Sequence, residues 1–200
     1  YMGKKMRICN SILAVSLFFS SLVYAEDERY IIDKTHFSLG FLVEHAGYAK
    51  TLGMFKNIDG SYIYNEESNI VSDVKINIDT SSVFTNHDKR DAHLRSPDFL
   101  NVEEYPLMTF KAARNDLNAN PDQIKGELTL LGISKPLTLN VKINKIAQYP
   151  FRVGITKPIV MGVSANASFL RSDFDMNYAI KKNLVGDQID LIIEFEARQQ

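Results

Sequence analysis

Apolar and polar residues alternate over most of the chain, and this period of two constrains the fold more than any other feature of the sequence. The alternation is regular in residues 73–79 and 137–144, and it returns near the C-terminus in residues 188–196. Successive side chains of a strand point to opposite faces of a sheet, so each run predicts a strand with one apolar face. The chain is therefore expected to be an all-β protein.

About eight strands are expected, joined mostly by links of hairpin length. Their approximate ranges are residues 36–44, 53–64, 73–79, 107–113, 124–130, 137–144, 161–169 and 188–196. Within the second, Asp59-Gly60 is typical of a bulge, and Leu131 to Lys135 are expected to form a hairpin loop. The pattern predicts antiparallel neighbours throughout.

One segment, residues 85–104, interrupts the alternation and predicts a short helical insert. Thr85 to Asp88 are typical of a variant capping box, in which polar side chains bond the free N–H groups of a first helical turn. Ser96-Pro97 is expected to end the helix, because a proline disfavours helical backbone in the residue before it.

Short antiparallel strands with one apolar face close into either a barrel or a sandwich, and alternation alone does not decide between them. The chain has no tryptophan and a single cysteine, which argues against an immunoglobulin-type sandwich. An eight-stranded barrel has an interior that side chains fill or that holds one small ligand.

The N-terminus has the three parts of a secretory signal peptide. Met2 to Arg7 are basic, Ile12 to Val23 are apolar, and Val23-Tyr24-Ala25 offers small residues for cleavage after Ala25. The apolar run of about 12 residues is shorter than the roughly 20 that a spanning helix needs. Cleavage would remove Cys9 and leave residues 26–200 as one domain without a disulfide.

Charge and motifs exclude several classes of function. The net charge of −1 offers no general attraction for nucleic acid. The sequence has no G-x-S-x-G nucleophile elbow, phosphate-binding loop, H-E-x-x-H zinc motif or dinucleotide fingerprint. We therefore expect a protein that is not an enzyme and needs no cofactor.

Four histidines are the candidates for metal binding, but their spacing does not predict a site. His36 and His45 are nine residues apart, which places them about 30 Å apart on opposite faces of a strand. His87 and His93 would project about 240° apart around a helix. No metal ligand set is expected from these residues.

Several segments resemble the YceI-like family. Residues 85–100 are similar to its pattern T-N-x-x-x-R-D-x-H-L-R-S-x-D-F, and residues 105–110 to Y-P-x-x-T/S-F. Residues 33–48 match D-x-x-H…F…H-x-G-Y, and residues 126–136 resemble G-x-L-T-x-x-G-x-T-K-P with Ser134 in place of the usual Thr. The order and spacing of these pieces extend the resemblance over residues 28–198.

The resemblance implies a periplasmic protein with an eight-stranded antiparallel lipocalin-like β-barrel. It also implies non-covalent binding of a polyisoprenoid or similar long-chain amphiphilic lipid in an apolar cavity, for transport, storage or a stress response. A monomer or homodimer that contacts a membrane surface transiently is compatible with this role. The side chains expected to line the cavity are Phe37, Leu39, Phe41, Val43, Val74, Ile76, Ile78, Leu128, Leu130, Leu139, Val141, Ile189, Leu191 and Ile193.

The polar residues of the family pattern are expected to be structural. They are His36, His45, Arg90, Asp91, His93 and Arg95. We expect Asp91 to pair with Arg90 or Arg95, and the His93 ring to bond a backbone carbonyl. Two alternatives stay open: an enzyme that uses His93, Asp91 and Arg95 on a hydrophobic substrate such as a lipid pyrophosphate, and an interaction or stress protein with a filled core.

Overall fold

The computed structural model describes residues 27–200, so the expected signal peptide and Cys9 lie outside the described residues. Its elements are β1 (Glu28–His45), β2 (Ala49–Phe55), β3 (Ile58–Asn65), β4 (Ile70–Asp79), η1 (Thr80–Ser82), β5 (Val83–Phe84), α1 (Asp88–Arg95), β6 (Leu107–Asp116), β7 (Gln123–Leu130), β8 (Ile133–Gln148), β9 (Ile159–Leu170), η2 (Arg171–Phe174) and β10 (Val185–Gln199). No helix in this part of the chain has the length and apolarity that crossing a bilayer requires.

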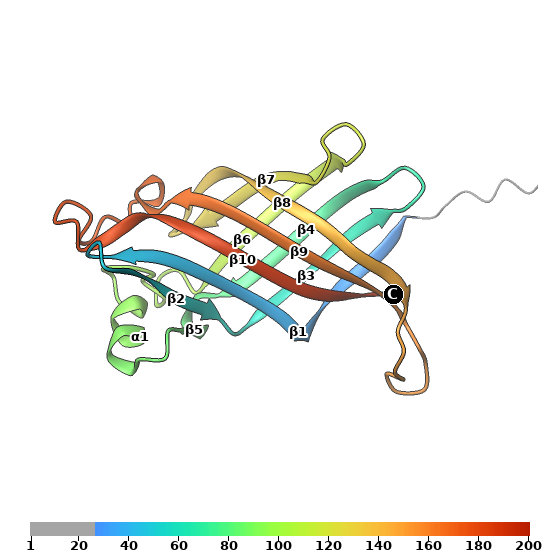
Figure 1. The fold of residues 1–200 in the computed structure, drawn as a ribbon, viewed down its shortest axis with the longest axis horizontal. Coiled ribbons are helices and arrows are strands. Elements are labelled where there is room, and N and C mark those ends of the chain that lie inside the picture. The colour runs from blue at the N-terminus through green and yellow to red at the C-terminus, as the bar shows by residue number, and fades with distance from the viewer. Residues whose placement is uncertain (1–26) are drawn as a thin grey trace, which may run out of the picture.

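The strands form one antiparallel sheet that closes on itself (Figure 1). Following the pairing, the ring is β1-β3-β4-β6-β7-β8-β9-β10, and β10 then pairs with β1. The expected eight-stranded barrel with a short helical insert is therefore confirmed. β2 and β5 lie outside this ring, because β2 pairs with the second half of β1 and β5 pairs with β2.

The alternation seen in the sequence becomes the division between the interior and the surface of the barrel. Where β1 pairs with β10, Leu39 lies opposite Ile193 and Phe41 opposite Leu191, and these side chains point inward. On the outer face, Lys50 of β2 forms an ion pair with Asp190 of β10 at 2.6 Å. Closure gives each of the eight strands of the ring a paired strand on both sides.

The two ends of the barrel differ in what covers them. At one end, called here the α1 end, lie α1, the β1–β2 and β7–β8 turns and the long β9–β10 connection. The opposite end carries the β3–β4, β6–β7 and β8–β9 connections, together with the C-terminus (Figure 1). The α1 end is therefore the end that the polar segment of the sequence covers.

The strand predicted over residues 53–64 is wrong as a continuous element, because it breaks at Lys56 and Asn57 into β2 and β3. The N–H groups of both residues donate to Ser82: Lys56 to its carbonyl at 3.3 Å, and Asn57 to its hydroxyl at 3.1 Å. These bonds to a residue far along the chain replace the ladder bonds at this point. The break separates the outer strand β2 from the ring strand β3.

Two predicted turns and bulges also differ in position. The ladder at Asp59-Gly60 is regular, and the irregularity lies between Ser61 and Ile63 instead. The β7–β8 turn consists of Leu131 and Gly132 alone, both with positive φ, so residues 133–135 belong to β8. Two central residues with positive φ match the twist of the flanking strands, which explains why so short a turn suffices.

α1 begins after His87 and not with a box based on Thr85. The Nδ1 atom of His87 accepts a hydrogen bond from the backbone N–H of Arg90 at 3.2 Å, so His87 caps the helix. Ser96 ends the helix as expected. Thr85 is free to make a different contact, which belongs to the site described next.

Candidate functional site

The barrel is hollow, and its interior contains two neighbouring cavities that share part of their walls. A deep cavity of about 130 Å³ and a chamber of about 380 Å³ at the α1 end share Met108 and Leu191 in their walls. Ligand pockets in proteins commonly measure roughly 300–1,000 Å³, so the chamber alone reaches that size. The two cavities are together called here the channel, and its mouth is the chamber at the α1 end.

All the side chains expected to line a cavity do lie along this channel. Ten of them border the deep cavity: Phe37, Leu39, Val74, Ile76, Ile78, Leu128, Leu139, Val141, Leu191 and Ile193. The mouth chamber is bordered by Phe41, Val43, Leu130 and Ile189, and again by Leu191. Whether these residues contact a ligand stays a prediction, since the geometry places them without testing binding.

Sequence reasoning missed several wall residues. Tyr62, Met108, Phe110, Met161 and Val163 also line the deep cavity. Val163 lies on the apolar face of the run 161–169, so the alternation contained a usable signal for it. Tyr62 lies on the strand whose break was not predicted, and the register there could not be assigned.

The deep cavity carries no charged side chain among the described residues that line it. Its polar atom is the hydroxyl of Tyr62, which donates to the sulfur of Met161 at 3.1 Å. Burial raises the pKa of Tyr62, so the phenol stays neutral. A neutral, apolar wall of this kind suits a hydrocarbon chain and excludes an ionic ligand.

Arg171 organises the loop that borders the mouth. Its side chain is only 1% exposed and donates to four backbone carbonyls, those of Met176, Tyr178, Val185 and Gly186, at 2.7–3.0 Å. Burial lowers the pKa of Arg171, but the carbonyl dipoles surround the cation. One side chain thus binds both ends of the β9–β10 connection.

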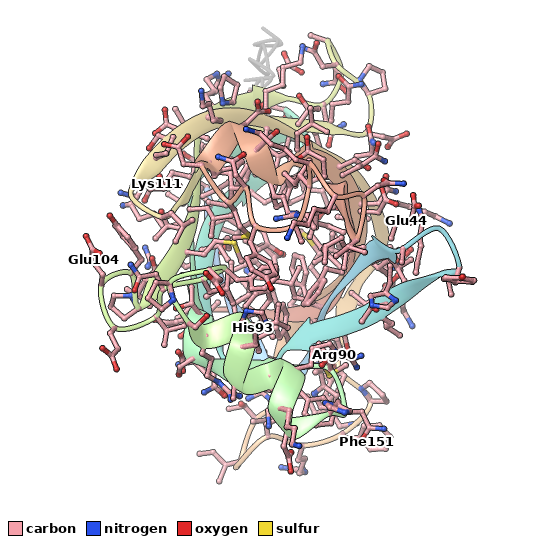
Figure 2. All side chains as sticks on the ribbon, turned by 90° about the vertical axis from the view of Figure 1, so that its left-hand side faces the viewer. Glu44, Arg90, His93, Glu104, Lys111 and Phe151 are labelled. Carbon is pink, nitrogen blue, oxygen red and sulfur yellow. The ribbon has the colours of Figure 1, made fainter. Side chains whose placement is uncertain are left out.

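His93 lies on the side of α1 that faces the barrel interior (Figure 2). Its ring packs edge-on against Phe99 and Tyr178, with centroids 5.0 Å from each. Its Nε2 atom is 2.8 Å from a carboxylate oxygen of Asp98, so the expected bond to a backbone carbonyl is wrong. Asp98 is five residues after His93 and lies beyond the end of α1, where the chain turns back toward the His93 ring.

Asp91 is buried and pairs with neither arginine, contrary to expectation. It accepts hydrogen bonds from the backbone N–H of Thr85, at 2.8 Å, and from the Thr85 hydroxyl. Arg90 reaches the same threonine, donating to its hydroxyl oxygen at 2.7 Å and to its carbonyl at 2.6 Å. Thr85 therefore stands between the two charged residues and fixes the start of α1.

The proposed catalytic group of His93, Asp91 and Arg95 does not converge. Arg95 donates to the carbonyls of Ser81 and Val83 at 2.8 and 2.9 Å, which ties α1 to η1 and β5. Only His93 of the three lines the mouth chamber. Arg90 and His45 of the family pattern line it as well, so the polar groups at the mouth differ from those expected to do chemistry.

His36 lies away from the channel, in a cluster with Asp33 and Glu196 whose ligand atoms come within 4.8 Å of one another. Such a set could hold a metal ion. However, Arg198 already donates to Asp33, and His36 Nδ1 lies 3.0 Å from Asp33 and 3.7 Å from Glu196. Arg198 thus already supplies a cation to this cluster, and a metal ion would have to compete with it for Asp33.

The chain resembles known proteins over most of its length. A family model described as the YceI-like domain matches residues 30–197. Protein YceI of Escherichia coli O6:H1 is 35% identical over 194 residues, covering 93% of this chain and 97% of the relative. A UPF0312 protein of Pseudomonas aeruginosa is 41% identical over 131 residues, covering 66% and 69%.

Solved structures show the same barrel. The YceI protein of Campylobacter jejuni superimposes with a TM-score of 0.64 at 28% identity, covering 78% of this chain and 90% of that one. A polyisoprenoid-binding domain from Saccharophagus degradans, implicated in plant cell wall breakdown, gives 0.61 at 15% identity, covering 88% and 100%. Because the family model spans most of the chain and the relatives share a third of its residues, the chain belongs to the YceI-like family.

Proposed function

We propose that the protein binds a polyisoprenoid or similar long-chain amphiphilic lipid non-covalently in the barrel channel and acts as its carrier in the periplasm. One observation carries the proposal: among the described residues, no charged side chain lines the depth of the channel, and charged side chains line its mouth. Each CH₂ group that a tail buries there contributes about 0.8 kcal/mol. The structural neighbour from Saccharophagus degradans, described as polyisoprenoid-binding, supports the same class of ligand.

The channel suggests how the lipid lies. The tail runs from the mouth chamber into the deep cavity, whose walls offer dispersion contacts and no charge. The head group stays in the mouth chamber, within reach of Thr85, Arg90, His93, Glu44 and His45. The signal peptide pattern, with cleavage after Ala25, supports export of the carrier. A carrier of this kind works as a monomer or a homodimer and meets a membrane when it loads.

Native mass spectrometry of the purified protein, combined with organic extraction, tests the proposal. We expect a bound chain-like lipid, and after its removal we expect uptake of solanesol, a long polyprenol, in preference to the short farnesol. Longer chains bury more CH₂ groups and so bind more tightly. A protein that carries no such lipid and takes up neither polyprenol contradicts the proposal.

A pair of matched variants locates the binding in the channel. Ala165 lines the deep cavity, so Ala165→Phe places a ring in the path of the tail and should abolish solanesol uptake. Ala113 is exposed on β6, and Ala113→Phe makes the same change outside the barrel. We expect the second variant to bind like the original protein. Equal uptake by both variants would place the lipid elsewhere.

A further inference from the structure

The β8–β9 connection, residues 149–158, projects from the body of the barrel and is called here the tongue (Figure 1). It is a hydrogen-bonded hairpin: Tyr149 N–H donates to Pro158 at 2.8 Å, and Val153 and Thr156 exchange bonds of 2.8 and 3.3 Å. Arg152 Nη1 also donates to the carbonyl of Ile155 at 3.0 Å. The tongue is therefore a shaped element with a defined tip.

The tip of the tongue presents large apolar side chains to water. Ile155 is 88% exposed and Phe151 is 68% exposed. The ring of Phe151 contacts Tyr149 edge-on at 5.6 Å, and Tyr149 in turn donates to Glu196 on β10, which anchors the base of the tongue. Exposed apolar residues that are scattered singly over a protein surface are normal, whereas exposed apolar residues that lie together mark interaction sites. The two side chains at the tip of the tongue are of the second kind.

The segment of the chain that contains the tongue carries only positive charges, while the carboxylate of Glu196 lies at the base of the tongue. No Asp or Glu occurs in residues 128–172, although the whole chain carries a net charge of −1. Arg152 and Lys157 belong to the tongue, and Lys142 and Lys145 lie exposed on β8, which leads into it. A basic segment that also exposes aromatic and branched apolar side chains suits an anionic lipid surface.

A second exposed apolar area lies on β2 and β5. Leu52 and Met54 of β2 and Phe84 of β5 are exposed beside one another, and the Lys56 ammonium lies 5.0 Å from the Phe84 ring centroid. In both views the tongue and the β5–α1 region project from the lower side of the barrel (Figures 1 and 2). A flat surface can therefore touch the tongue and the β5–α1 region at once.

We propose that the tongue docks the protein on an anionic lipid bilayer. Phe151 and Ile155 enter the interfacial layer, while Arg152 and Lys157 contact lipid phosphates. The β5–α1 region then approaches the same surface, which brings the mouth at the α1 end close to the membrane. A protein partner fits less well, because a stable interface uses about 20–30 residues a side and the tongue has far fewer.

Vesicle flotation with the full folded protein tests the docking. We expect binding to vesicles of equimolar phosphatidylglycerol and phosphatidylcholine, weak binding to phosphatidylcholine alone, and loss of binding as salt is added. Binding to vesicles is measured separately from lipid uptake into the channel. A failure of docking and a failure of the carrier proposal can therefore be told apart, and Ala165→Phe should dock normally.

Two variants of the tongue and two matched controls assign the surface. Phe151→Ser with Ile155→Ser should weaken vesicle binding at least about tenfold, and Lys157→Glu at least about fivefold, since each basic residue near an anionic surface contributes about a fivefold factor. The controls are Leu107→Ser, which removes an exposed apolar side chain of β6, and Lys111→Glu (Figure 2). Both controls should bind like the original protein.

Three results overturn the proposal: no binding to anionic vesicles, equal binding to neutral vesicles, or unchanged binding by the tongue variants. Sedimentation velocity without lipid adds a fourth. A dimer that Phe151→Ser with Ile155→Ser dissociates would assign the tongue to contact between copies of the chain instead. Thermal unfolding checks that the variants are folded, and we expect little change because the substituted side chains are exposed.

Discussion

At the scale of single residues, Asp33 shows how one buried carboxylate holds a corner of the barrel. Between the pairs Ile32–Ala197 and Phe37–Phe195, β1 contains residues 33–36 whereas β10 contains only Glu196. Asp33 accepts bonds from Thr35, His36 and Arg198 and so fixes this bulge. Burial alone would raise the pKa of Asp33, but these bonds outweigh it and hold the pKa well below its usual range.

The same cluster predicts a pH dependence of stability. The bond to Asp33 raises the pKa of His36 above its ordinary value of about 6.5. Because the pKa of His36 is raised in the folded protein, the stabilisation by the His36–Asp33 interaction is complete below about pH 6.5. It is lost as the pH rises through the folded-state pKa of His36. His36→Gln should therefore cost more near pH 5.5 than near pH 8.5. The half-exposed ring limits the difference to less than about 1 kcal/mol.

Urea denaturation of both proteins at the two pH values measures this difference. Asp33 has the opposite sign, because its lowered pKa gives stability that is present above about pH 3.9 and lost only as the pH falls further. It therefore contributes equally at both values. If His36→Gln lowers the free energy of unfolding equally at both pH values, or more at the higher one, the stabilising role given to the His36–Asp33 interaction is wrong.

Arg171 carries the second prediction at this scale. Arg171→Met leaves four buried or half-buried carbonyls without their donor, so we expect the free energy of unfolding to fall by at least about 3 kcal/mol. Lys142→Met removes an exposed cation from the adjacent strand and should change it by less than about 0.5 kcal/mol. Denaturant titration compares them, and similar values for both would argue against the role given to Arg171.

At the scale of elements, the distance between neighbouring strands decides whether a glycine can be replaced by a residue with a Cβ atom. A Cβ atom on Gly126 of β7 would lie 2.5 Å from the carbonyl oxygen of Lys111 and 2.5 Å from the Phe110 ring. A Cβ atom on Gly162 of β9 would have its nearest neighbour 4.0 Å away, the Cβ atom of Asn144. The backbone of β6 cannot move aside as a flexible side chain can, so β6 and β7 require a glycine at this position.

The two glycines make a matched test. Gly126→Ala should lower the free energy of unfolding by about 1–3 kcal/mol, the usual cost of overpacking. Gly162→Ala should be neutral or stabilising by up to about 1 kcal/mol, because alanine restricts the unfolded chain. Thermal unfolding monitored by circular dichroism separates the outcomes. If the two variants melt alike, the close approach of β6 and β7 is not what constrains Gly126.

At the scale of the whole molecule, the barrel is stable while its centre stays hollow. Closure through the β10–β1 pairing gives each ring strand two neighbours, and the apolar faces of the strands point to the interior. Side chains around the channel lack partners on one side, so they forfeit dispersion contacts that an occupant would restore. Ligand binding and stability should therefore be coupled.

That coupling predicts a ligand-dependent melting temperature. With solanesol at about 100 times its Kd, the folded state should gain about 2.7 kcal/mol by mass action. The delipidated protein should melt at a lower temperature than the loaded one, and solanesol should leave the melting of Ala165→Phe unchanged. A scan of melting temperature against solanesol concentration checks both. A delipidated protein that melts no lower contradicts the coupling.

Local contacts were predictable from the sequence, whereas contacts between distant residues were not. The strands, the helical insert and the inward-facing residues follow from alternation over a few neighbours. The partners of Asp91 and His93 were assigned wrongly, because charge type alone cannot show that Thr85 and Asp98 lie closer. Arg198 is 165 residues from Asp33, and no pattern in the chain pairs them.

The amino-acid order by itself determined which face of each strand is apolar, since period-two alternation is a property of adjacent residues. Only the tertiary structure decided that these faces do not meet at the centre. The radius of a barrel depends on how many strands close the ring and how far their registers are staggered. The number of strands and their stagger are set when β10 pairs with β1, which lie at the two ends of the described chain. No single segment of the sequence therefore determines them.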